Sequence, residues 1–206
     1  MKKIALTIAA TCSVAVALVL AQAGLAGQPV TQPLNPPPPS FETCKATGTQ
    51  TICQGARTLP PYGPDDTGVA CGSGSSAFDM FDSGVESQVA ARYYDADGNL
   101  TRRVIHQTND SALSNPLTGA AIPYLQKNTI TDVVAIPGDF PDSATETITG
   151  EQNFTVPGMG PVMLNAGRIV TAPDGTVEFS AGPQGFMDYF SGDTSALDEL
   201  CTALGA

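Results

Sequence analysis

Three basic side chains, Arg102, His106 and Arg168, lie among apolar residues in two stretches of alternating sequence. Successive side chains of a β-strand point to opposite faces, so in the first stretch Tyr93 and Leu100 share a face with Arg102 and His106. A buried guanidinium needs an anionic partner, which a carboxylate ligand would supply. We therefore predict a site for a small acidic or polar ligand, in which His106 responds to pH near neutrality. Its residues are Tyr93, Arg102, His106 and Arg168.

A structural role is the alternative for these basic side chains. Long basic side chains reach from strand ends into water, or pair with acidic residues of the same chain such as Glu146, Glu151 or Glu178. The sequence contains twenty acidic residues, so internal partners are plentiful.

Patterns that indicate catalysis or a cofactor are few. His106 is the only histidine, and no Gly-x-Ser-x-Gly turn accompanies it. The run DADGN at 95–99 resembles the start of a calcium loop, but Leu100 and His106 stand where such a loop needs glycine and glutamate. An Asp-Gly hairpin turn explains the run, so we predict no metal. We also predict no nucleotide cofactor, because glycine-rich phosphate-binding motifs are missing from the sequence.

Residues 88–107 predict a β-hairpin around an Asp-Gly turn. A two-residue turn would place Arg92 directly opposite Arg103, where like charges repel. A four-residue loop at 95–98 avoids this and pairs Val89 with Val104. We therefore expect the longer loop, although both registers leave the same residues on the more apolar face.

Residues 162–181 predict a second hairpin, with a loop at 172–175. This loop would pair Val170 with Val177 and Arg168 with Phe179. Arg168 would then lie among apolar neighbours, as Arg102 does in the first hairpin.

About eight short strands with turn residues between them predict a mainly β fold. We expect an antiparallel β-barrel with a short C-terminal helix, because sequential hairpins favour up-and-down order; a two-sheet β-sandwich is the alternative. The helix is indicated by apolar residues at i, i+3, i+4 and i+7, with Asp193 or Thr194 at its start and Gly205 at its end. Its apolar residues are Leu197, Leu200, Cys201 and Leu204.

The N-terminal region predicts export. Residues 1–26 have a charged start, an apolar run and small residues at a cleavage site, as a signal peptide does, with an uncleaved membrane anchor as the alternative. Residues 27–43 are rich in proline and predict an extended spacer or a proline-rich ligand for another protein. Residues 44–206 would form a single disulfide-containing domain, secreted or held in the cell envelope, with no stable membrane insertion after cleavage.

Four cysteines remain after cleavage, and an even number in an exported chain predicts disulfide bonds. Three pairings are compatible with the sequence, and we prefer Cys44 with Cys53 and Cys71 with Cys201. Cleavage removes Lys2 and Lys3 from nine basic and twenty acidic residues, which leaves a net charge of 7 − 20 = −13. Such a charge repels phosphate backbones and argues against nucleic-acid binding.

Several motifs resemble a group of exported proteins of unknown function from high-GC Gram-positive bacteria. They are ARYYDADGNLTRRV at 91–104, SNPLTG at 114–119, AIPGDF at 135–140, AGRIV and PDGTVEF further on, and the ending LCTALGA. The resemblance covers most of the chain from Thr51 onward and implies a bacterial exported protein, without implying an activity. The general design is also similar, at the level of fold, to barrels of the allene oxide cyclase and dirigent type.

Together these features predict an exported protein that binds a small acidic or polar ligand, or a partner surface, without catalysis. The competing interpretations are a hydrolase with paired carboxylates, an isomerase acting in an apolar barrel, and a structural protein of the cell envelope.

Overall fold

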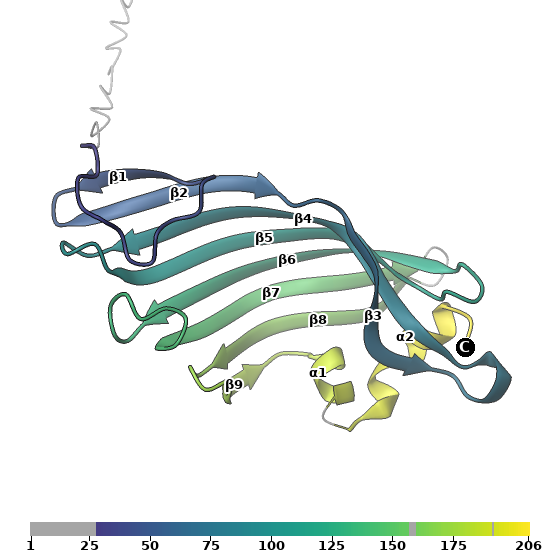
Figure 1. The fold of residues 1–206 in the computed structure, drawn as a ribbon. Coiled ribbons are helices and arrows are strands. Elements are labelled where there is room, and N and C mark those ends of the chain that lie inside the picture. The colour runs from purple at the N-terminus through teal and green to yellow at the C-terminus, as the bar shows by residue number, and fades with distance from the viewer. Residues whose placement is uncertain (1–27, 157–159, 191) are drawn as a thin grey trace, which may run out of the picture.

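Two long strands, β4 (Phe78–Tyr94) and β5 (Leu100–Ser114), form a hairpin near the centre of one antiparallel sheet (Figure 1). The computed structural model describes residues 28–156, 160–190 and 192–206. The remaining strands are β1 (Thr43–Thr47), β2 (Gln50–Thr58), β3 (Tyr62–Cys71), β6 (Ala121–Val134), β7 (Ala144–Val156), β8 (Gly160–Thr171) and β9 (Val177–Ala181). The helices are η1 (Gly74–Ser76), α1 (Gly185–Phe190), η2 (Thr194–Leu197) and α2 (Asp198–Ala203). The mainly β prediction is therefore confirmed.

The sheet is open. Its strand order is β1-β2-β4-β5-β6-β7-β8-β9, while β3 pairs with the first part of β4 and β2 pairs with the last part. Within the described residues β1 and β9 are the end strands and do not pair with each other (Figure 1). These strands therefore do not close into the expected barrel, and they form one sheet rather than the two of a sandwich. Sequential hairpins give up-and-down order, but this order does not itself require closure.

The register of the first hairpin differs from the expected one. Arg92 lies directly opposite Arg103, and Val89 lies opposite His106 rather than Val104. The repulsion between the two guanidinium groups is offset, because Arg92 forms an ion pair with Glu42 and Arg103 forms one with Asp132. These carboxylates lie in distant parts of the chain, so the two strands alone do not predict them.

A β-bulge next to Tyr94 changes the face of one predicted residue. Tyr93 pairs with Arg102 and Tyr94 pairs with Leu100, so the ladder shifts by one residue at Thr101. Leu100 is therefore fully buried on the opposite face from Arg102, not beside it as expected.

The second hairpin is also shifted from its expected register. Val170 pairs with Phe179, and Arg168 pairs with Ala181. A bulge between Val170 and Thr171 accounts for the difference. Because the shift is by two residues, Arg168 still shares a face with Phe179, as predicted.

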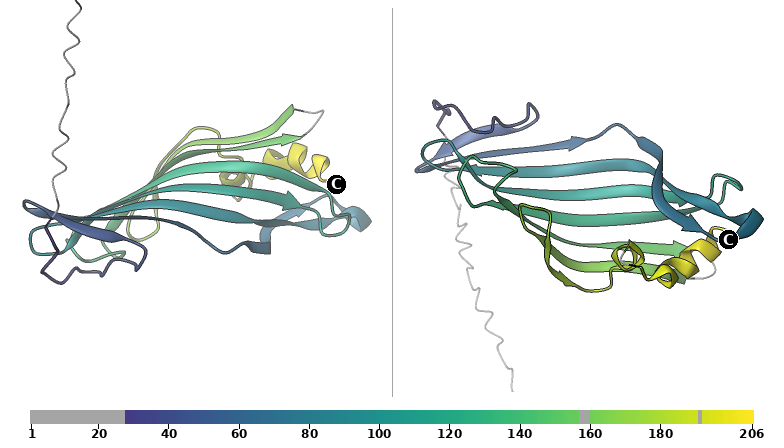
Figure 2. Two further views of the ribbon diagram at one scale, coloured as in Figure 1. Left: turned by 90° about the horizontal axis from the view of Figure 1, so that it is seen from above. Right: turned by 60° about the horizontal axis from the view of Figure 1, so that its bottom comes forward.

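The two faces of the sheet have different surroundings. The helix-covered face is the side on which α1, η2 and α2 pack, at the end of the sheet near β3 (Figure 2). Its apolar cluster consists mainly of Met80, Leu113, Ile122, Tyr124 and Phe154 from the sheet, with Leu197, Leu200 and Leu204 from the C-terminal segment. A second, smaller cluster at the other end of this face contains Cys53, Tyr94, Leu100, Val134 and Ala144. We name the opposite side the open face, because none of the helices in the described residues packs on it.

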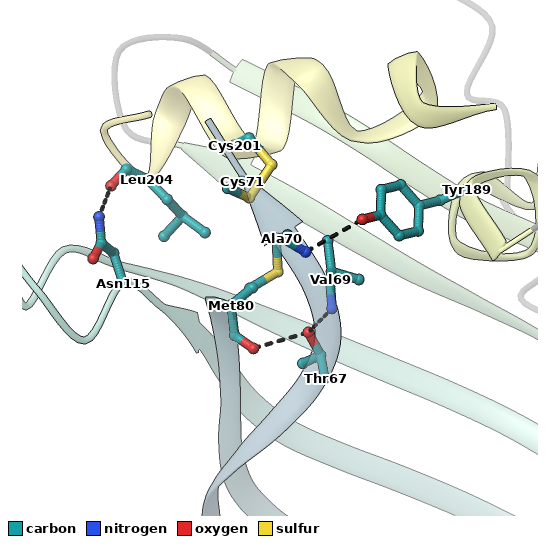
Figure 3. Close-up of a disulfide and its surroundings, with 9 residues drawn as sticks. All are labelled: Thr67, Val69, Ala70, Cys71, Met80, Asn115, Tyr189, Cys201 and Leu204. Atoms are coloured by element: carbon teal, nitrogen blue, oxygen red, sulfur yellow. Dashed lines mark hydrogen bonds between the residues drawn. A yellow bond between two sulfur atoms is a disulfide. The ribbon is translucent and has the colours of Figure 1, made fainter. Parts of the chain in front are cut away.

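The C-terminal helix forms as its spacing predicts. The Asp193 side chain accepts a hydrogen bond from the Ser195 backbone N–H, and Gly205 ends the helix with a φ of 93°. The Cys71–Cys201 disulfide fixes α2 to β3, and the Asn115 side chain donates to the Leu204 carbonyl at 3.1 Å (Figure 3). Cys44–Cys53 is the second disulfide, across β1 and β2, so both preferred pairs are present. Disulfides are typical of oxidising environments outside the cytoplasm.

The predicted spacer, residues 27–43, lies against the sheet over its described part. The Asn35 backbone bonds to Gly98 and Leu100, and the Pro36 carbonyl accepts a hydrogen bond from the Tyr94 hydroxyl. Leu34 packs on the smaller apolar cluster. This segment therefore belongs to the folded domain, whereas the predicted signal peptide, residues 1–26, lies outside the described residues.

Candidate functional site

The residues predicted to bind a ligand all lie on the open face. Tyr93 and Arg102 are cross-strand partners on β4 and β5, and His106 lies further along β5. Arg168 lies on β8 in the same cross-strand row as His106, separated from it by Thr129 and Thr149. Alternation predicted correctly that Tyr93, Arg102 and His106 share a face. It did not show that this face is the exposed one.

These side chains are too far apart to surround one small ligand. Arg102 and His106 are four residues apart on β5, roughly 13 Å at the rise of an extended strand. His106 and Arg168 are three strand spacings apart, about 14 Å. The interior pocket expected between Arg102 and Arg168 is therefore not formed, because an open sheet does not bring them together.

Each of these two arginines rests on an aromatic ring. The Arg102 guanidinium carbon lies 4.1 Å from the centre of the Tyr93 ring, and that of Arg168 lies 5.7 Å from the Phe179 ring. These distances are typical of cation–π contacts. In the described part of the chain neither arginine has a carboxylate within ion-pair distance, since the two ion pairs found involve Arg92 and Arg103. Both guanidinium groups are therefore available to an acidic partner.

His106 lies between two hollows of the open face. One, of about 420 Å³, is lined by Val89, Tyr93 and Val104 among others. The second, of about 570 Å³, is lined on its other side by Lys127 and Thr129, and the Nδ1 atom of His106 lies 3.0 Å from the Thr129 hydroxyl oxygen. His106 is thus the one predicted site residue that lines both hollows.

Apolar side chains surround these polar groups on the open face. Val89 and Val133 are more than half exposed, at 55% and 54%, and Phe179 is 49% exposed. Leu125 and Leu164 are each 45% exposed on the same face. We did not predict Val133, Leu125 or Leu164 as surface residues, because alternation marks an apolar face without indicating whether another layer covers it.

A third hollow, of about 240 Å³, lies on the helix-covered face. Its lining is dominated by amide side chains, including Gln126, Asn128, Gln152 and Asn165. No prediction included these residues. The sequence does contain a pattern that marks them. On each of the strands β5 to β8, two successive positions of this face carry an amide or a glycine between apolar residues.

Buried ionisable groups lie outside these hollows. On the helix-covered face Asp132 is the cross-strand partner of Glu146, and Arg103 donates to Asp132 at 2.6 Å. Burial raises the pKa of the Glu146 carboxyl, the charge of Asp132 raises it further, and Arg103 lowers it. Among the described residues Glu151 is the one carboxylate that lines these three hollows, so their described linings do not contain the paired carboxylates of a glycoside hydrolase.

A second polar cluster joins β3, β4 and β6. The Asp82 carboxylate accepts hydrogen bonds from the hydroxyls of Tyr124 and Tyr62, at 2.9 Å and 3.0 Å. Burial raises the pKa of the Tyr124 phenol, and the charge of Asp82 raises it further. Both tyrosines are therefore protonated donors at neutral pH, which is consistent with a structural role.

Within the described ranges no cluster of three or more metal-binding side chains is found, and no helix is long and apolar enough to cross a membrane. Comparisons with protein-family models, with curated proteins and with solved structures each find no match to this chain.

Proposed function

We propose that this protein is an exported binding protein that holds an acidic protein surface against the open face of its sheet. The observation that carries the proposal is the pair of arginines, Arg102 and Arg168. Each lies over an aromatic ring among exposed apolar side chains, and neither has a carboxylate of the described residues within ion-pair distance. A guanidinium over an aromatic ring can still donate its N–H groups to a partner's carboxylates.

The spacing of the arginines favours a partner surface over a small acidic ligand. Combining their separations along and across the strands gives roughly 19 Å, which exceeds the reach of a single small molecule. The open face, about six strands wide and eight residues long, offers on the order of 700 Å², close to one partner's share of a standard protein interface.

The charges of this face favour an acidic partner over a second copy of the chain. On β5 to β8 the open face carries Arg102, Lys127 and Arg168 but only two acids, Asp110 and Glu151. Lys127 and Glu151 are direct cross-strand neighbours, so their charges largely offset each other. If two copies met face to face, the two arginines of each copy would therefore find few acidic partners on the other copy.

A synthetic peptide that alternates glutamate and leucine provides the test, with a lysine–leucine peptide as the control. Binding of the acidic peptide to the mature chain is measured by biolayer interferometry at low and high salt. We expect the Arg102→Glu, Arg168→Glu double variant to weaken binding by tenfold or more. The matched Arg57→Glu variant alters an exposed arginine on the other face and should bind like the parent. Equal binding of both peptides would contradict the proposal.

A further inference from the structure

The middle of the helix-covered face is a polar floor between two apolar clusters. Two adjacent cross-strand rows form this floor. One row consists of Asn109, Gln126, Gln152 and Asn165, and the other of Gln107, Asn128, Gly150 and Gly167. Polar groups are costly in a covered position unless they are hydrogen-bonded, so this floor needs an explanation.

The amide side chains of the first row form two hydrogen-bonded pairs, and each pair leaves one oxygen without a donor among the described residues. The Asn109 side-chain N–H donates to the Gln126 carbonyl oxygen at 3.1 Å, and the Asn165 side-chain N–H donates to Gln152 at 3.0 Å. In each pair the Oδ1 atom of the asparagine is shielded from solvent and accepts no hydrogen bond from the described protein atoms. Of these two side chains only Asn165 lines the hollow on this face, because Asn109 lies three strand spacings away, about 14 Å, and outside the lining.

Beside the Asn165 side chain there is room for a small molecule. The hollow of about 240 Å³ is smaller than the roughly 300–1,000 Å³ of sites for drug-sized ligands. Gly150 and Gly167 put no side chains on its floor, while Ile148, Ile169 and Phe186 form apolar surface around it. The hollow thus combines amide groups with an aromatic side, and its volume suits a small ligand.

On β5 to β8 the amide rows contain no charged side chain; Glu86 continues the first row on β4, beside Asn109 and outside the lining of the hollow. Glu151 also lines the hollow, but it directly precedes Gln152 on β7 and therefore belongs to the open face, where Lys127 is its cross-strand neighbour. Asparagine and glutamine offer both donors and acceptors without charge. A neutral ligand that carries several hydroxyl groups matches this set, because each hydroxyl can donate to a free carbonyl oxygen and accept from an amide N–H.

We propose that this hollow is a second binding site, on the opposite face from the partner surface, for a small neutral polyhydroxylated molecule of monosaccharide size. The amide side chains of Gln126, Gln152 and Asn165 provide hydrogen-bonding groups, and Phe186 provides the apolar side for the carbon skeleton of the ring.

The test uses the mature, oxidised chain and four neutral probes: glucose, galactose, mannose and myo-inositol. Isothermal titration calorimetry is expected to show at least one of them binding with a Kd of about 1 mM or tighter and raising the Tm. Glucuronate, cyclohexanol and N-acetylglycinamide serve as charged, hydroxyl-poor and peptide-like comparisons. Tighter binding of any of these three, or no binding of the four neutral probes, would overturn the proposal.

Variants connect the binding to the site. Asn165→Leu and Gln152→Leu each remove an amide that lines the hollow with little change in volume, and each should weaken binding by tenfold or more. Asn153→Leu is the matched control, because Asn153 is exposed on the other face of β7, and its affinity should equal that of the parent. Unchanged affinity in both floor variants would contradict the assignment.

Should Asn165→Leu lower the Tm by several degrees, Asn165→Asp provides a second variant, since it keeps an accepting oxygen but adds charge. Its affinity for the neutral probe should lie between those of the parent and the leucine variant; binding as weak as in the leucine variant would show that the oxygen does not accept from the ligand. The Arg102→Glu, Arg168→Glu variant separates the two proposals, because it should leave probe binding unchanged.

Discussion

Arg92 and Arg103 face each other directly across the central β4–β5 ladder, and each has its own carboxylate partner. The Glu42 partner of Arg92 comes from the segment before β1, and the Asp132 partner of Arg103 comes from β6. The distances between donor and acceptor atoms are 3.2 Å and 2.6 Å. The central hairpin therefore depends on charges supplied by both of its flanks.

Removing the Asp132 carboxylate should destabilise the protein strongly. In Asp132→Ala the mostly buried Arg103 loses its partner and faces Arg92, and the loss of a buried pair member typically costs about 3–5 kcal/mol. Urea denaturation should therefore show a lower midpoint. A double variant, Arg103→Leu with Asp132→Leu, should recover most of the loss; recovery of none would mean that the charge pairing is not the cause.

Mild acidification should strengthen the fold through Glu146. Its folded-state pKa lies above the ordinary value of 4.5, because of burial and of the Asp132 charge. The folded chain thus holds this proton more tightly, and the stabilisation is fully present below pH 4.5 and is lost as the pH rises through the raised pKa. Glu146→Gln should raise the Tm at pH 7 and reduce the gain in Tm between pH 7 and pH 5. The exposed Glu151→Gln is the control, and an equal effect of the two substitutions would contradict this account.

The two disulfides should contribute unequally to stability. Cys71–Cys201 links residues 130 positions apart, whereas Cys44–Cys53 links residues nine apart. In the chain-entropy model the first is worth about 5 kcal/mol and the second about 2.5 kcal/mol. Urea denaturation of the two double-serine variants should show the larger loss for Cys71→Ser with Cys201→Ser. The reverse order would indicate that strain or residual structure dominates over loop entropy.

The hydroxyl of Tyr124 should stabilise the link between β6 and the buried end of β4, where it bonds the Asp82 carboxylate. Tyr124→Phe leaves one hydrogen bond to the Asp82 carboxylate, from Tyr62, and should cost about 1–3 kcal/mol. Because burial raises the pKa of Tyr124, its contribution is present below the ordinary tyrosine pKa of about 10 and is lost as the pH rises through the folded value. The parent should therefore lose stability above pH 10 more steeply than the phenylalanine variant, as thermal denaturation can measure.

Local sequence patterns determined several features of this protein. Alternation placed Tyr93, Arg102 and His106 on one face, and the spacing of Leu197, Leu200 and Leu204 indicated the C-terminal helix. These patterns reflect the geometry of a single strand or helix, which depends on neighbouring residues alone. The preference for a short and a long disulfide loop also corresponds to the bonds present.

Only the tertiary structure decided which face is covered, which register the hairpins take and where the hollows lie. The repulsion that argued against pairing Arg92 with Arg103 is cancelled by Glu42, 50 positions from Arg92 in sequence, and by Asp132, 29 positions from Arg103. The amides of the polar floor likewise become neighbours only when four strands align. A side chain's alternation is a local property, whereas its burial and its partners depend on which distant segment packs against it.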